Sequence, residues 1–220
     1  MFRTTAVTIA LLLSAPLLAA DGGDISKVNG SVRVEANKTA GEVSTVNGSI
    51  RIEDGARIES AETVNGSITL TVDTVAESLS TVNGSIQVGE RSRITESVEA
   101  VNGRIHLDRG ADVGGAVSNV NGEIRLDGAR VGSGIRTVSG NLVIGADSQV
   151  TGGVLIEKPS GSWFKPDSSR KPRVVIGPRA VVDGTLEFRR EVDLYVSDSA
   201  RIGPVSGATP KTFSGDQPTE

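Results

Sequence analysis

The sequence predicts an all-β protein, a single-stranded parallel β-helix (β-solenoid) with about 18–19 residues per turn. Three observations lead to this prediction. A short motif returns at nearly constant spacing, apolar and polar residues alternate after each motif, and aromatic residues make up only 3% of the chain. A globular core usually draws much of its buried area from aromatic and branched side chains. Val and Ile must supply that area here, which indicates a narrow core repeated along the chain.

The motif is Val-Asn-Gly, and its copies follow one another every 18 or 19 residues. They begin at Val28, Val46, Val64, Val82, Val101 and Val120, and a Val-Ser-Gly variant begins at Val138. Six copies in register within one short chain indicate a repeat architecture, in which each unit packs on the next.

A strand with one buried face is expected after each motif. Residues 49–53 read Ser-Ile-Arg-Ile-Glu, and such a period of two is typical of a strand. Helix-based repeats need longer units, about 33–34 residues for ankyrin and tetratricopeptide repeats. Three short strands joined by tight corners fit the unit length, and turns stacked about 4.8 Å apart would pair each backbone with its neighbours.

The Asn-Gly pair is expected at a sharp corner, because Asn and Gly tolerate positive φ better than other residues. Stacking would then place six asparagines in a structural corner ladder of side-chain hydrogen bonds: Asn29, Asn47, Asn65, Asn83, Asn102 and Asn121. Glycosylation is the alternative, because Asn29, Asn37, Asn47, Asn65 and Asn83 lie in Asn-x-Ser/Thr sequons. The corner interpretation is favoured, because Asn102 and Asn121 recur at the same position without a sequon.

Residues 1–20 are predicted to be a secretory signal peptide. Arg3 precedes an apolar run from Ala6 to Ala20, which is too short to span a bilayer and ends in small residues. We therefore expect cleavage after Ala20, export to the periplasm or to the cell surface and medium, and no membrane insertion of the mature chain. Cleavage leaves 22 Lys and Arg against 27 Asp and Glu, a net charge of −5 with no basic tract, which argues against nucleic acid as a partner.

The predicted organisation continues after the signal peptide with the solenoid over residues 21–157. A projecting loop is expected over 158–172, because prolines interrupt the pattern there, and it carries Trp163 and Phe164. Further turns are expected over 173–203, followed by a disordered tail over 204–220 that is rich in Gly, Ser, Thr and Pro.

Candidate catalytic and metal-binding residues are few. The chain has no cysteine and one histidine, His106, which is expected on the outer face of a strand. Asp108, Asp112 and Asp127 could approach one another on neighbouring turns, and paired carboxylates can cleave sugars or hold calcium. Solvated turn residues are the preferred interpretation, so no enzyme, cofactor or metal site is predicted. The serines after the corner (Ser31, Ser49, Ser67, Ser85) and the threonines before it (Thr45, Thr63, Thr81, Thr137) form a hydroxyl array, which on a flat surface could bind ice.

The repeat Thr-Val-Asn-Gly-Ser-Ile, which begins at Thr45, Thr63 and Thr81, resembles repeats of bacterial adhesin-type β-solenoid proteins of unknown function. The segment from Ile176 to Gly184 is similar to the repeats of bactofilin-type, polymer-forming proteins. The two resemblances together cover about residues 25–203. They imply a β-helix that joins end to end with further copies, and they transfer no site residues.

The sequence therefore predicts a non-catalytic structural or adhesive protein of the cell envelope that acts through its solenoid surface. Its expected partners are further copies of itself and a glycan or another envelope component. The alternative is a glycan-binding or glycan-modifying β-helix, with Trp163 and Phe164 as the ligand contact.

Overall fold

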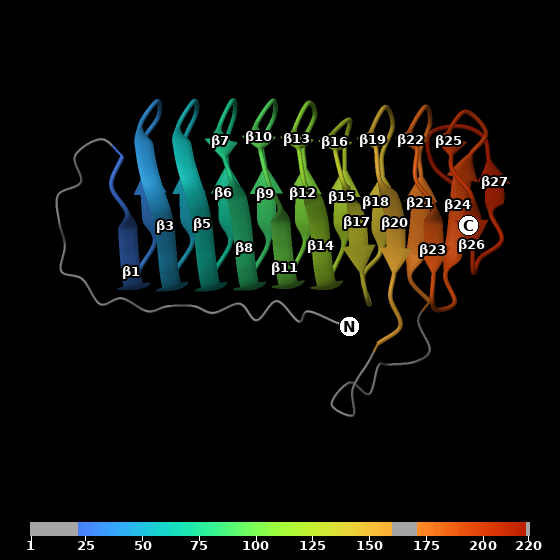
Figure 1. Cartoon of the computed structure of the whole chain (residues 1–220), viewed down its shortest axis with the longest axis horizontal. Coiled ribbons are helices and arrows are strands. Elements are labelled where there is room, and N and C mark those ends of the chain that lie inside the picture. Colours follow the sequence, from blue (N-terminus) through green and yellow to red (C-terminus); the bar gives the residue numbers. More distant parts are fainter. Residues whose placement is uncertain (1–21, 160–170, 219–220) are drawn as a thin grey trace.

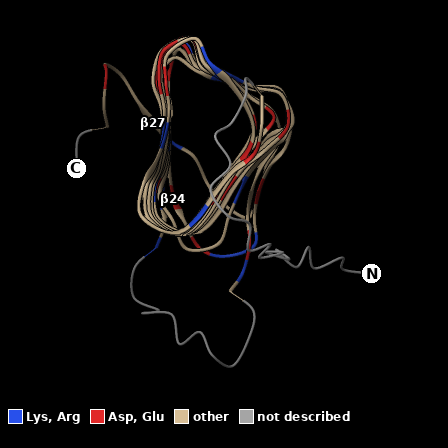
Figure 2. Cartoon of the chain, turned by 90° about the vertical axis from the view of Figure 1, so that its left-hand side faces the viewer, with Lys and Arg blue, Asp and Glu red and all other residues tan. Residues whose placement is uncertain are grey.

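The computed structural model describes residues 22–159 and 171–218, and these form one β-solenoid of about ten turns. The turns stack along a single axis into a rod, with β1 (Ile25–Asn29) at one end and β27 (Lys211–Phe213) at the other (Figure 1). Seen from the β1 end, they superimpose into a flattened cross-section (Figure 2). The expected signal peptide and most of the expected loop, including Trp163 and Phe164, lie outside the described residues.

Each turn contributes one strand to face one, a parallel sheet of ten strands. These are β2 (Val32–Val34), β4 (Ile50–Ile52), β6 (Ile68–Leu70), β9 (Ile86–Val88), β12 (Ile105–Leu107), β15 (Ile124–Leu126), β18 (Leu142–Ile144), β21 (Arg173–Ile176), β24 (Asp193–Ser197) and β27.

Face two is short and joins face three through a bend. Its strands are β7 (Val75–Ala76), β10 (Arg93–Ile94), β13 (Asp112–Val113), β16 (Arg130–Val131), β19 (Gln149–Val150), β22 (Val181–Val182) and β25 (Arg201–Ile202). Face three contains β1, β8 (Ser78–Asn83), β11 (Val98–Asn102), β14 (Ala116–Asn121), β17 (Gly134–Thr137), β20 (Gly153–Ile156), β23 (Leu186–Phe188) and β26 (Val205–Ser206). In the early turns β3 (Thr39–Asn47) and β5 (Arg57–Asn65) run through both faces.

The core is a stack of branched apolar side chains, as the alternation predicts. On face one every turn from β2 to β24 buries two of them, in register with the turns before and after. The first column is Val32, Ile50, Ile68, Ile86, Ile105, Ile124, Leu142, Val174 and Leu194. Because like side chains stack directly on one another, aliphatic residues fill most of the interior, and Phe188 is the one aromatic residue buried in the core of the described ranges.

The register survives the interruption after β20. Leu142 of β18 lies opposite Val174 of β21, and Val154 of β20 lies opposite Leu186 of β23, so the stack resumes after the intervening segment. The interruption falls between a strand of face three and a strand of face one, at the position where earlier turns carry Val-Asn-Gly.

The positive-φ corner lies elsewhere than the sequence predicts. A column of left-handed residues follows face one, at Asn37, Gly55, Asp73, Arg91, Gly110, Gly128, Asp147 and Arg179. At the Val-Asn-Gly corners only Gly30 and Gly122 have positive φ. Glycine recurs there for a different reason, since a Cβ at Gly48, Gly66, Gly84 or Gly103 would overlap the glycine carbonyl of the preceding turn.

The prediction of a disordered tail over 204–220 is wrong where β26 and β27 lie within it. β26 pairs with β23 and β27 pairs with β24, which completes the last turn of the stack. The composition is misleading because an end strand needs few apolar residues when the turn beneath it supplies the hydrogen-bond partners.

Candidate functional site

The outer surface of the rod holds the residues that the sequence singles out, and the corner asparagines are the most regular of them. Each Asn donates its Nδ2–H to the Oδ1 of the Asn one turn earlier, over 2.9–3.1 Å, from Asn121 back to Asn29. The six residues thus form a continuous amide ladder at one corner. The carbonyl oxygens of this ladder point toward β14 and its free donor lies at the β1 end.

The threonines before the corner are buried, so they do not form a surface hydroxyl array. Thr45, Thr63 and Thr81 are at most 4% exposed, and each donates its hydroxyl to the carbonyl of the corner glycine one turn earlier. Asn119 takes over this role with a bond of 2.8 Å to the carbonyl of Gly103. The hydroxyl of Thr137 and Oδ1 of Asn119 have no hydrogen-bond partner within the described residues.

The valine of each Val-Asn-Gly points outward, and after the first turn it alternates with a buried residue beside it: Thr45, Thr63, Thr81, Ala100 or Asn119. Val28 is 46% exposed, and the equivalent valines on the following turns are half-buried. The repeat therefore presents a stripe of β-branched side chains next to the amide ladder on face three.

Charged side chains on face one bond between turns. Glu53 accepts hydrogen bonds from Arg33 of the previous turn and from Arg51 of its own strand. The hydrogen bond from Arg33 is the main reason that the pKa of Glu53 lies below that of an ordinary glutamate. A similar fork joins Arg91 to Asp73 at the left-handed corner, with both bonds at 2.8 Å.

Two of the three candidate aspartates come together on face one, around His106. Nε2 of His106 lies 2.8 Å from Asp127 and 3.4 Å from Asp108, and Nε of Arg125 lies 2.9 Å from the same Asp127 oxygen. Burial opposes ionisation of Asp127, but hydrogen bonds from Arg125 and His106 outweigh it and lower the pKa of its carboxyl group.

Asp112 does not join this cluster. It belongs to β13 on face two, where its carboxylate lies 3.1 Å from Arg93. Asp108 also accepts a bond of 3.2 Å from Gln87, so the carboxylates that do meet are held in hydrogen bonds with their neighbours. Residues 22–159 and 171–218 hold no cluster of three His, Cys, Asp or Glu side chains that could bind a metal ion.

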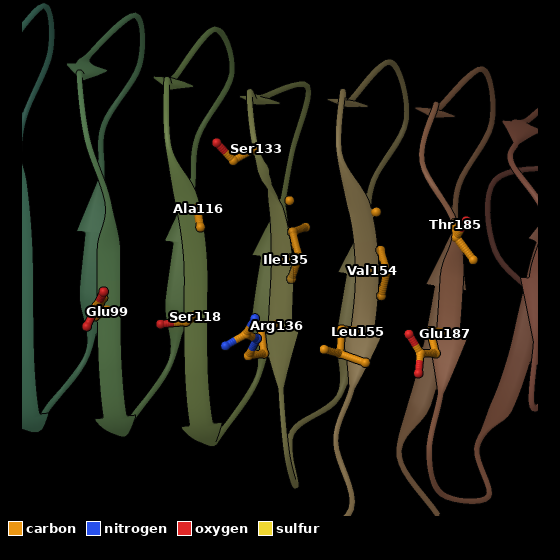
Figure 3. Close-up of a pocket in the computed structure, with 12 residues that line it drawn as sticks. Glu99, Ala116, Ser118, Ser133, Ile135, Arg136, Val154, Leu155, Thr185 and Glu187 are labelled. Atoms are coloured by element: carbon orange, nitrogen blue, oxygen red, sulfur yellow. The ribbon is translucent and has the colours of Figure 1, made fainter. Parts of the chain in front are cut away.

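A shallow groove of about 440 Å³ crosses face three in the later turns. Its floor is low because Ala116, Gly134 and Gly153 follow one another in register where earlier turns carry Glu42, Ser60 and Ser78. Beside this floor runs a row formed by Glu99, Ser118, Arg136, Leu155 and Glu187 on successive turns (Figure 3). This groove was not predicted from the sequence, although the loss of side chains along one column is its signal.

A second groove, of about 520 Å³, lies on face one beneath the end of the described chain. Val143 and Val175 form its apolar part, and Arg125 and Asp127 line its side toward His106. Residues 216–218 form its opposite wall, and Nη2 of Arg173 donates to the carbonyl of Pro218 over 3.5 Å.

Both grooves reach the base of the segment that was expected to project. Leu155 in β20 lines the first groove, and Arg173 at the start of β21 lines the second. Trp163 and Phe164 lie between these two strands in the sequence.

Comparisons with protein-family models, with curated proteins and with solved structures give no match to this chain. Within the described ranges, no helix is long and apolar enough to cross a membrane.

Proposed function

We propose that this chain is a non-catalytic structural or adhesive protein of the bacterial cell envelope, which acts through its solenoid surface and associates with itself. The observation that carries the proposal is the rod itself. Its long faces are repeated columns of side chains, and its two ends are strands with a partner on one side only. An unpaired strand edge can add another chain, and a stacked rod holds its surface at fixed spacing without disulfides.

Location in the envelope rests on the predicted signal peptide over residues 1–20. Expression in a bacterial host followed by fractionation and intact mass measurement tests this part. We expect a periplasmic or extracellular product that begins at Asp21. Retention of the full mass in the cytoplasm would contradict it.

Self-association is tested with light scattering coupled to gel filtration on residues 21–220, across a hundredfold range of concentration. All strand pairings described above lie within this range, so residues 21–220 contain every described turn. We expect the mass to rise with concentration. A monomer at every concentration would remove self-association and leave a binding role of the surface.

A carbohydrate contact is the second candidate function, because both grooves reach the base of the segment that carries Trp163 and Phe164. Sugar rings pack on aromatic faces, and hydroxyl and charged groups beside them fix orientation. We expect binding on a glycan array to be lost in Trp163→Ala and largely retained in Trp163→Phe. Equal binding by both variants and the parent chain would remove this segment from the contact.

A further inference from the structure

The two ends of the rod differ in how they treat their edge strands. At the β1 end, β1 pairs only with β3 and β2 pairs only with β4. β1 is five residues long, and the first turn over residues 23–40 contains no proline. Long edges without proline are the ones open to pairing with a further strand.

The register shows which backbone groups point out of this end. Val32 donates to the carbonyl of Ser49, and Gly30 donates to the carbonyl of Asn47, so both residues face the next turn. The N–H and C=O of one residue in a parallel ladder point to the same side, and the side alternates along the strand. Arg33 in β2 and Asn29 in β1 therefore direct their backbone groups outward.

The amide ladder ends at the same place. Asn29 accepts from Asn47 through its Oδ1, and its own Nδ2 has no hydrogen-bond partner among the described residues. The β1 end thus presents outward backbone groups on both flat faces and the free amide of Asn29 at the corner between them, where Nζ of Lys27 already donates to the carbonyl of Ser31.

The opposite end is closed to such pairing. On faces two and three β25 and β26 have two residues each, against five in β1, and Pro204 and Pro210 directly precede β26 and β27. Short strands, proline and lysine are the usual means of blunting a sheet edge. The chain then folds back, with the Ser214 hydroxyl 2.7 Å from Asp198.

We propose that two copies of the mature chain join through their β1 ends and that the assembly stops at this dimer. This inference rests on the self-association proposed above and specifies its interface. A two-fold axis through both flat faces reverses the strand direction on each, so β1 would meet β1, and β2 would meet β2, in antiparallel pairs. Each edge strand then pairs its outward backbone groups with those of the same strand in the other copy. The first turn carries three Lys or Arg against two Asp or Glu, so its small net charge leaves little repulsion between the two ends.

Light scattering distinguishes this dimer from the alternatives. We expect the mass of residues 21–220 to reach a plateau at two copies. Growth beyond two copies would overturn the dimer but keep the proposed self-association, whereas a monomer throughout would remove both.

Proline substitutions test which end is used. Arg33→Pro removes an outward N–H at the β1 end, and Thr212→Pro is its matched control, because Phe213 faces β24 and Thr212 therefore points out of the other end. We expect the dissociation constant to rise at least tenfold in Arg33→Pro and to stay within twofold in Thr212→Pro, with unchanged circular dichroism in both. The opposite pattern would place the contact at the other end.

Labelling gives a test that does not depend on proline. The chain has no cysteine, so Ser26→Cys and Ser206→Cys each introduce a single thiol near one end of the same column on face three. Nine steps of about 4.8 Å make the rod about 43 Å long, so spin labels at Ser26 should lie far closer together across the dimer than labels at Ser206. A short distance between labels at Ser206 instead would contradict the inference.

Discussion

The turns that carry Val-Asn-Gly and the turns after Val138 use the same core but different surfaces. In the early turns the outward positions bond from one turn to the next, through the amide ladder and through pairs such as Arg33 with Glu53. In the later turns the outer column of face one becomes Val143, Val175 and Tyr195, and both grooves lie from Glu99 onward. Ion pairs between turns continue there, as between Arg179 and Asp147, but they stand beside grooves and apolar outward residues.

This difference teaches that the most regular turns and the grooves lie in different parts of the rod. Identical turns give columns of identical side chains, which can only form ladders or repel one another. A hollow needs a change of side-chain size between turns, and the replacement of Ser60 and Ser78 by Ala116, Gly134 and Gly153 supplies it on face three.

The strongest test of the regular half is at a corner glycine. Gly66→Ala would place a methyl group against the carbonyl of Gly48, where backbone leaves no room to move. We expect the free energy of unfolding to fall by about 3 kcal/mol or more, as overpacking against fixed backbone does.

The matched control for this change is Gly30→Ala in the first turn. Gly30 has open space around its Cβ position but a φ of 106°. We expect a smaller loss of about 1–2 kcal/mol, from backbone strain alone. Chemical denaturation of both variants decides the point, and equal losses would show that close stacking is not what requires the corner glycines.

These glycines also show what the sequence could and could not predict. The repeat spacing and the alternation around Ile50 predict the solenoid and its core correctly, because both are local consequences of stacking identical strands. The left-handed corner was assigned to Asn-Gly, while the structure places it after face one, where residues as unlike as Arg91 and Gly110 occupy it. Because the neighbouring turns impose this backbone conformation, the residue type at the corner does not predict it.

The surface was harder to predict than the core. The threonines before the corner were expected outside and lie inside, because a hydroxyl beside a glycine carbonyl can be buried without leaving a polar group unpaired. The meeting of His106 with Asp108 and Asp127, and the exclusion of Asp112, depend on which face each strand joins. The spacing of these residues along the chain does not determine which face each strand joins.

The buried threonines give the next contrast between the halves. Thr81 donates to the carbonyl of Gly66 over 3.1 Å, whereas the buried hydroxyl of Thr137 has no partner among the described residues. Thr81→Val should destabilise the fold by about 1–2 kcal/mol, because it leaves a buried carbonyl with one bond fewer. Thr137→Val should be neutral or stabilising, since it removes an unpaired polar group. Destabilisation by Thr137→Val equal to that by Thr81→Val, in urea unfolding, would contradict this account.

The amide ladder can be broken and lengthened. Asn65→Ala removes two ladder bonds, to Asn47 and from Asn83, and we expect a loss of about 1 kcal/mol because these amides are exposed to water. Ser139 follows Val138 where the next ladder residue would stand, so Ser139→Asn should extend the ladder past Asn121 and raise stability by about 0.5 kcal/mol. Ser139→Ala is the control. The melting temperatures of the three variants test this. A melting temperature of Asn65→Ala equal to that of the parent chain would show that the ladder does not stabilise the fold.

The smallest expected effects come from two glutamates whose pKa values move in opposite directions. Burial and the charge of Glu42 raise the pKa of Glu62, whereas the hydrogen bond from Arg33 lowers the pKa of Glu53. A raised pKa means that the folded state holds the proton more tightly, so ionised Glu62 reduces stability at neutral pH and this loss disappears as pH falls. For Glu53 the sign reverses, and its stabilising effect is present at neutral pH and is lost on acidification. Glu62→Gln should therefore raise Tm slightly at pH 7, and Glu53→Gln should lower it. Both differences in Tm should shrink toward pH 3. Shifts of the same sign at pH 7 would contradict the pairing of Glu53 with Arg33.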